Sequence, residues 1–221
     1  MDKICIARTP PIGQDHLGPT YQVLQVAPTG SNGVPIATMV WPPNHRTVTY
    51  AIGRKSKDIP MHYAEVKAIN LAVLKWQVEA NITFKQVSVT QSPDITFDFI
   101  DPTTDNIMKT DSTIMGYSGF PGTDLQGHVK LNDNLNWGWQ SVNFSYNVNN
   151  TLTHEFGHAI GMEHTPECPR CIMYPVYNGV TELGTDDIIQ VTTAYGVRTW
   201  ANGWYARIKN AIHVILGRTN P

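Results

Sequence analysis

The feature that most constrains this chain is the run HEFGHAIGMEH, which begins at His154. His154 and His158 stand four residues apart, so on a helix their rings lie one turn apart and can reach one metal ion. Gly161 tolerates the positive φ that ends a helix, which lets the chain turn and bring His164 to the same ion. Three neutral imidazoles leave the fourth zinc position open for water, and Glu155 directly follows the first ligand. The run therefore predicts a catalytic zinc site with Glu155 as general base.

A second motif after the third histidine makes the pattern specific. A pair of histidines four apart can arise by chance on any helix, whereas the extended form with Gly161 and His164 is a strong signal. Met173 and Pro175 follow in CIMYP, where the methionine is expected in a tight turn. With HEFGHAIGMEHT, IMYPVY and TDDIIQVTTAYG, the chain resembles the matrixins, a branch of the metzincin metallopeptidases. The resemblance covers about residues 41–196 and implies a zinc-dependent endopeptidase that hydrolyses internal peptide bonds of proteins.

The resemblance also implies roles for residues around the zinc. Met173 would form an apolar floor beneath the metal. Met115 and Gly116 would lie on an edge strand that pairs with a protein or peptide substrate in extended conformation. A pocket for the substrate residue after the scissile bond, the S1′ pocket, is expected to prefer an apolar side chain. Its residues would be Asn150 near the base and Pro175, Val176 and Tyr177 in the wall.

The chain departs from the matrixin pattern where that family binds a second, structural zinc and calcium. Tyr117 and Lys130 stand where family histidines would be, and Leu135 stands where a calcium-binding glutamate would be. Tyrosine and lysine are both protonated at neutral pH and are poor zinc ligands. We therefore expect one zinc per chain, and we expect any calcium site to be weak or absent.

The order of predicted elements indicates the fold class. Residues Thr47–Ile52 alternate and are β-branched, as in a strand, and residues 60–79 have the spacing of an amphipathic helix. Further strands are expected at residues 82–87, 94–99, 113–117 and 128–131, and further helices at 151–161 and 186–195. This order indicates an α/β or α+β domain with one mixed sheet. The resemblance to the metzincins implies the α+β form, with a mixed, twisted sheet, two long helices, an active-site helix, a methionine turn and a C-terminal helix.

The two ends of the chain are read as additions to the catalytic domain at residues 41–196. Residues 1–40 are rich in Pro, Gly and Thr, so regular structure is expected to begin near Trp41. This N-terminal extension would lie on the domain or link to another part. Residues 197–221 form a predicted helical tail that packs on the domain or docks a partner.

Three cysteines leave several states open. Cys168 and Cys171 form a CxxC pair that favours a local disulfide over metal binding. Cys5 lies upstream of the domain, outside any matrixin latency motif, and is expected as a free or buried thiol rather than as a zinc-bound thiolate.

Composition excludes some other classes of protein. The net charge is −2 with 15% charged residues, which gives no support to nucleic-acid binding, and no apolar run is long enough to span a membrane. The resemblance implies an extracellular protein, although the N-terminus shows no apolar signal-peptide region. Two alternatives remain open: a protease domain that serves in a larger assembly, and an inactive binding module of the same fold.

Overall fold

The computed structural model describes residues 4–8, 29–59, 62–111, 113–139 and 146–199. Six strands form one sheet in the order β1-β5-β6-β4-β2-β3, and β7 pairs with β8 in a second, two-stranded sheet. The strands are β1 (Ile4–Arg8), β2 (Thr47–Ile52), β3 (Thr83–Gln86), β4 (Ile95–Ile100), β5 (Ile114–Gly119), β6 (His128–Asn132), β7 (Trp137–Gly138) and β8 (Tyr146–Asn147). The helices are α1 (His62–Glu79), α2 (Val148–Ala159) and α3 (Thr185–Tyr195), with short 3-10 turns at Val89–Gln91, Pro102–Thr104 and Met108–Thr110.

The large sheet is mixed, as predicted. Its neighbouring strands pair in parallel, except that β5 and β6 are antiparallel. Strand β2 shows why the sequence forms it: the side chains of Val48 and Tyr50 are buried, whereas Thr47 and Thr49 are more exposed. That alternation fits a strand with one face on the core. The α+β class is therefore confirmed.

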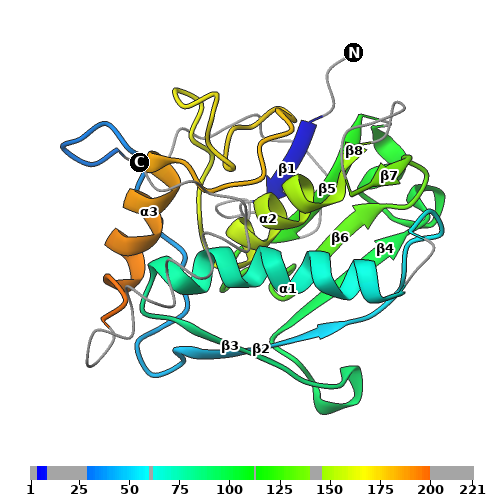
Figure 1. Cartoon of the computed structure of the whole chain (residues 1–221), viewed down its shortest axis with the longest axis horizontal. Coiled ribbons are helices and arrows are strands. Elements are labelled where there is room, and N and C mark those ends of the chain that lie inside the picture. The colour runs from blue at the N-terminus through cyan, green and yellow to red at the C-terminus, as the bar shows by residue number, and fades with distance from the viewer. Residues whose placement is uncertain (1–3, 9–28, 60–61, 112, 140–145, 200–221) are drawn as a thin grey trace.

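Helices α1 and α2 lie side by side next to the sheet, with α3 near the end of α1 (Figure 1). One face of α1 is buried in the main core, where Trp76 is fully inaccessible and donates from its indole N–H to the Thr153 carbonyl of α2 at 2.9 Å. Every residue of α2 is buried. A helix buried on all sides is held in one position, so it can present side chains to a site with little freedom.

Helix α2 begins earlier than the sequence suggests. Asn147 is its N-cap, and its side chain accepts from the Asn149 amide at 2.9 Å, so the helix starts at Val148 rather than at residue 151. It ends at Ala159, and Gly161 then takes a φ of 92°. A Cβ atom on Gly161 would lie 2.0 Å from the Met39 carbonyl oxygen, so only glycine fits this turn.

The N-terminal region contains a strand that the sequence analysis missed. Strand β1 pairs in parallel with β5 and lies near α2 (Figure 1, dark blue), so the prediction that regular structure begins near Trp41 is wrong. The prediction that Met115 and Gly116 lie on an edge strand is also wrong, because β1 is outside β5 in the sheet. The physical reason is that the edge of β5 offers unpaired amide and carbonyl groups, which an extended segment of chain can satisfy.

At the other end, Val197 bridges to Ala80, and the Arg198 side chain donates to the Ala80 carbonyl at 2.9 Å. The predicted tail helix lies outside the described residues. Within the part of the chain that the structure describes, no helix is both long enough and apolar enough to cross a membrane.

Candidate active site

The three predicted histidines meet at one point. His154 and His158 project from one face of α2, and His164 approaches after the turn at Gly161. The Nε2 atoms of His158 and His154 lie 3.0 Å apart, those of His158 and His164 3.2 Å, and those of His164 and His154 3.3 Å. The ring nitrogens therefore form a nearly equilateral triangle.

Backbone carbonyls orient two of these rings. Nδ1 of His154 lies 2.6 Å from the Ile172 carbonyl oxygen, and Nδ1 of His158 lies 2.7 Å from the Met162 carbonyl oxygen. Each carbonyl accepts only from a protonated Nδ1, which leaves the Nε2 lone pair of a neutral ring facing the centre of the triangle. Burial lowers the pKa of His154 to about 4. Burial and the nearby His154 ring lower the pKa of His164 to about 3. All three rings, His158 included, are thus neutral at pH 7.

This arrangement fits a zinc ion. Tetrahedral zinc with Zn–N bonds of about 2.0–2.1 Å places its ligand nitrogens about 3.3 Å apart, close to the separations between these Nε2 atoms. Nitrogen lone pairs that face one another at this distance repel unless a cation lies between them. Within the described chain, His154, His158 and His164 are one of two sets of potential ligands close enough to share an ion.

Glu155 directly follows the first histidine on α2 and is fully buried. Its neighbour is Gly116 on β5: a Cβ atom there would approach the Glu155 Oε1 and Cγ atoms to 3.2 Å and the Lys130 carbonyl oxygen to 3.0 Å. Glycine at 116 thus leaves the room that the Glu155 carboxylate occupies. Because α2 packs on β5, the Glu155 carboxylate is held in position against Gly116.

Met173 lies in the interior beneath α2. A Cβ atom on Gly157 would be 2.5 Å from the Met173 sulfur, so the turn packs closely against the helix. Asp187, near the start of α3, holds the methionine turn in place. Its carboxylate accepts hydrogen bonds from the backbone amides of Ile172 at 2.7 Å, Gly184 at 2.8 Å and Met173 at 3.1 Å. Burial raises the pKa of Asp187 to about 6, although the three amides favour its ionised form.

The residues predicted for the pocket lie on α2 and on the segment that follows the methionine turn, and each makes its own contacts. Asn150, 3% exposed, donates from its amide to Asn178 Oδ1 at 3.0 Å and to the Val180 carbonyl. The Tyr177 hydroxyl accepts from the Asn147 amide at 2.7 Å, and Pro175 and Val176 precede it in a half-buried segment. We call residues 175–177 the wall segment and residues 178–183, which follow it, the rear loop.

Tyr117 and Lys130 converge on a residue that the sequence analysis did not identify, Asp105. The Tyr117 hydroxyl donates to Asp105 Oδ2 at 2.8 Å, and the Lys130 ammonium lies 3.1 Å from the same oxygen. Burial alone would raise the pKa of Asp105, but hydrogen bonds from the Met108 and Ile107 amides, Tyr117 and Lys130 outweigh it and lower this pKa. Leu135, where a calcium ligand would stand, packs on the apolar core.

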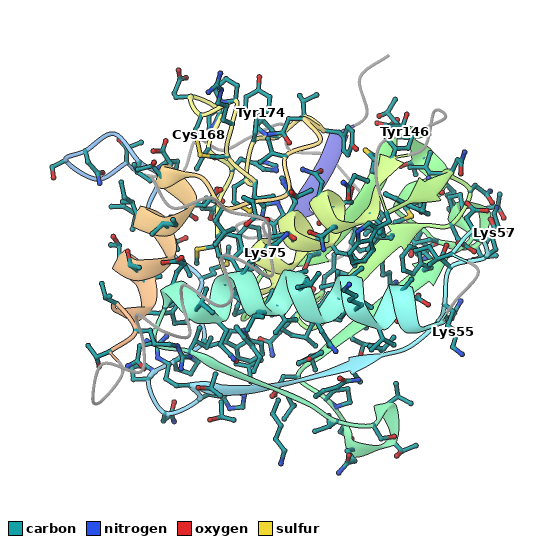
Figure 2. All side chains as sticks on the ribbon, viewed as in Figure 1. Lys55, Lys57, Lys75, Tyr146, Cys168 and Tyr174 are labelled. Atoms are coloured by element: carbon teal, nitrogen blue, oxygen red, sulfur yellow. A yellow bond between two sulfur atoms is a disulfide. The ribbon has the colours of Figure 1, made fainter. Side chains whose placement is uncertain are left out.

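Cys168 and Cys171 form a disulfide, with an S–S distance of 2.04 Å, as the sequence favoured. Cys168 and Tyr174 lie on the loop that joins the third histidine to the wall segment (Figure 2). With Asp186, the two cysteines form the second set of potential metal ligands among the described residues. Their sulfurs are bonded to each other here, so they cannot act as thiolate ligands in this state.

Lys75, a buried lysine that belongs to no predicted motif, links α1 to α2 and the rear loop. Its position carried a signal, because it continues the helical spacing of the buried residues Ala68 and Ala72. For Asp105, by contrast, nothing in the local sequence separates it from the exposed aspartates nearby.

The chain is similar to known proteins over most of its length. The family profile described as Matrixin matches residues 40–196. Matrilysin of Homo sapiens is 30% identical over 163 residues, which cover 70% of this chain and 58% of that protein. Interstitial collagenase of Equus caballus is 29% identical over 161 residues, covering 71% of this chain and 33% of the collagenase. Karilysin of Tannerella forsythia is 27% identical over 175 residues, which cover 76% of this chain and 36% of karilysin. The chain thus spans between about a third and three fifths of the length of these relatives.

Proposed function

This chain belongs to the matrixin family, whose members are metalloendopeptidases, and on that premise we propose that it is a zinc-dependent endopeptidase. It would hydrolyse internal peptide bonds of protein substrates. The observation that carries the proposal is the triangle of Nε2 atoms from His154, His158 and His164, with the buried Glu155 next to the first ligand on α2.

The roles of the residues follow from their positions. Zinc held by the three imidazoles would act as a Lewis acid and lower the pKa of a water molecule. Glu155 takes a proton from the attacking water and passes it to the leaving amine. Its burial against Gly116 limits the carboxylate to a small volume, so little reorganisation is needed during the reaction. Met173 supports α2 from below, and Asp187 keeps the methionine turn in place.

We propose that an extended substrate pairs with β5 near Met115 and Gly116. The closeness of Gly116 to Glu155 supports this position, because a peptide paired there would bring its carbonyl near the carboxylate. The side chain after the scissile bond would enter a pocket with Asn150 at its base and Pro175, Val176 and Tyr177 in its wall.

Strand β1 changes how this pairing can happen. It occupies the edge of β5, so a substrate strand can pair with β5 only after β1 has left. The form of the chain with β1 seated would therefore be the less active one.

The Cys168–Cys171 disulfide supports a location outside the cytosol, because disulfides persist in oxidising compartments. We propose that the protein acts extracellularly. The resemblance to relatives named matrilysin and interstitial collagenase agrees with a protein substrate.

A peptide-library digest followed by mass spectrometry tests the function. The zinc-loaded protein should cleave internal bonds, and Glu155→Ala should keep its zinc and its fold while losing about 10²–10⁴-fold in turnover. His158→Ala should lose both zinc and activity, since it removes one of the three ligands.

Two results would contradict the proposal. Protein that stays free of metal in excess zinc would exclude the site. Zinc-loaded wild-type protein that cleaves no library peptide, or Glu155→Ala with unchanged turnover, would favour a binding module of the same fold.

A further inference from the structure

Lys75 is an unusual buried charge close to the candidate pocket. Its side chain starts on α1, and the residue is only 2% exposed (Figure 2). Burying an ammonium is costly unless it is paired and hydrogen-bonded, so its partners show what it stabilises. Those partners lie outside α1, on α2 and on the rear loop.

The contacts of Lys75 join three parts of the molecule. Its ammonium donates to the Asn149 side-chain carbonyl at the start of α2 and to the Thr181 backbone carbonyl in the rear loop. Glu182 Oε1, in the same loop, lies 3.7 Å from the ammonium nitrogen and supplies a counter-charge. Asn149 in turn donates to the Ala68 carbonyl of α1 at 3.3 Å. Lys75 therefore fixes the rear loop relative to both helices.

The rear loop has no helix or strand of its own, and side chains fix it at neighbouring points. Asn150 donates to the Val180 carbonyl, and Asn178 Oδ1 accepts the Val180 amide at 3.0 Å. Asn178 also donates to the Cys171 carbonyl at 2.8 Å, which links the loop to the methionine turn. Lys75 holds the next residue, Thr181, so the loop is fixed to α1, to α2 and to the methionine turn.

We infer that Lys75 sets the depth of the pocket that takes the substrate side chain after the scissile bond, by anchoring the rear loop. Asn150 and the anchored loop would form a polar base for this pocket, and a base held in place by Lys75 should favour shorter side chains over longer ones. Lys75 does not touch the substrate; it is a positioning residue for specificity. This inference rests on the proposed peptidase function.

The substitution Lys75→Met isolates the anchor. Methionine keeps most of the apolar stem and so preserves the packing between α1 and α2. It removes the donor for the Thr181 carbonyl and for Asn149. The buried Asn149 carbonyl and the partly buried Thr181 carbonyl then lose their donor, so the rear loop is expected to move or to admit water. The pocket base then becomes deeper and less uniform.

The experiment measures kcat/KM for peptides that differ only in the residue after the scissile bond: alanine, leucine, phenylalanine and tryptophan. Wild-type protein should prefer leucine over tryptophan, and Lys75→Met should reduce that preference by roughly 10-fold, which is the size of effect that a change in pocket fit produces. Lys67→Met, an exposed lysine on the same helix, is the matched control and should leave the preference unchanged.

A second variant keeps the test decisive if Lys75→Met folds poorly. Glu182→Gln keeps the ammonium and its carbonyl contacts but removes the counter-charge, and it should shift the preference in the same direction by a smaller factor. If both variants cleave with the wild-type preference, Lys75 only stabilises the fold and the inference is wrong. If the wild-type protein cleaves no peptide while binding zinc, the peptidase proposal fails instead.

Discussion

Substituting Lys130 by methionine tests the charge cluster around Asp105. One carboxylate oxygen, Oδ2, receives the Tyr117 hydroxyl at 2.8 Å and the Lys130 ammonium at 3.1 Å, and the other accepts the Ile107 and Met108 amides. The resemblance to the matrixins implied zinc-binding histidines at the positions of Lys130 and Tyr117. The ammonium thus supplies the positive charge that compensates Asp105, and its loss should weaken the loop between β4 and β5.

The structure sets the size of the effect. The side chain of Lys130 is 24% exposed and that of Asp105 is 8% exposed, so this ion pair is intermediate between a surface ion pair and a buried one. Surface pairs contribute about 0–1 kcal/mol, whereas removing one partner of a buried pair costs about 3–5 kcal/mol. We therefore expect Lys130→Met to lower the free energy of unfolding by about 2 kcal/mol. For a chain of this length that corresponds to a fall in Tm of about 4–8 °C.

The effect should depend on pH in a definite direction. The pKa of Asp105 lies below its ordinary value, so its contribution to stability is present above the unfolded pKa of about 3.9 and is lost as the pH falls through the folded pKa. Once Asp105 is protonated, the ammonium has no charge to compensate. The difference in unfolding free energy between wild type and Lys130→Met should therefore be largest near pH 7 and shrink below about pH 4.

Urea unfolding at pH 7 and in the acid range measures both quantities, with the exposed Lys85→Met as control. A double-mutant cycle with Asp105→Asn should return a coupling of about 1–2 kcal/mol between the two side chains. Elemental analysis of the same wild-type protein should give one zinc per chain. A change below about 0.5 kcal/mol that is independent of pH would refute the reasoning, and two tightly held zincs would refute the view that Lys130 stands in for a metal.

Two further predictions concern the active site. Gly116→Ala adds a methyl group 3.2 Å from the Glu155 carboxylate, so kcat should fall by roughly 10-fold while the zinc content stays unchanged; an unchanged kcat would show that Glu155 has room to spare. A chain without residues 1–8 exposes the edge of β5, so its kcat/KM should exceed that of the full chain. The increase should be roughly 10-fold for each 1.4 kcal/mol of free energy by which pairing of β1 with β5 is favoured over its release. Full-length Cys5→Ser is its control, and equal rates for the shortened and full chains would show that β1 does not block the substrate.

Local patterns predicted most of the regular elements. Strand β2 matches its expected bounds, and α1 begins at His62 rather than at residue 60. The start of α2 was placed three residues late, at 151 instead of Val148, because the asparagines before it suit a cap or a turn as well as a helix. Strand β1 was missed because five residues without a regular alternation become a strand only when a partner edge is present.

What the sequence determined by itself was the metal-binding pattern and the family. Ligand spacing on a helix depends on backbone geometry alone, so His154 and His158 had to share a face, and Gly161 could be expected to turn the chain toward His164. Only the tertiary structure decided that β1 covers the edge of β5, that Asp105 joins Tyr117 to Lys130, and that Lys75 anchors the rear loop. Each of these depends on contacts between residues distant in the chain, and the cost of burying a charge or a strand edge can be met only where the folded chain brings a partner to it.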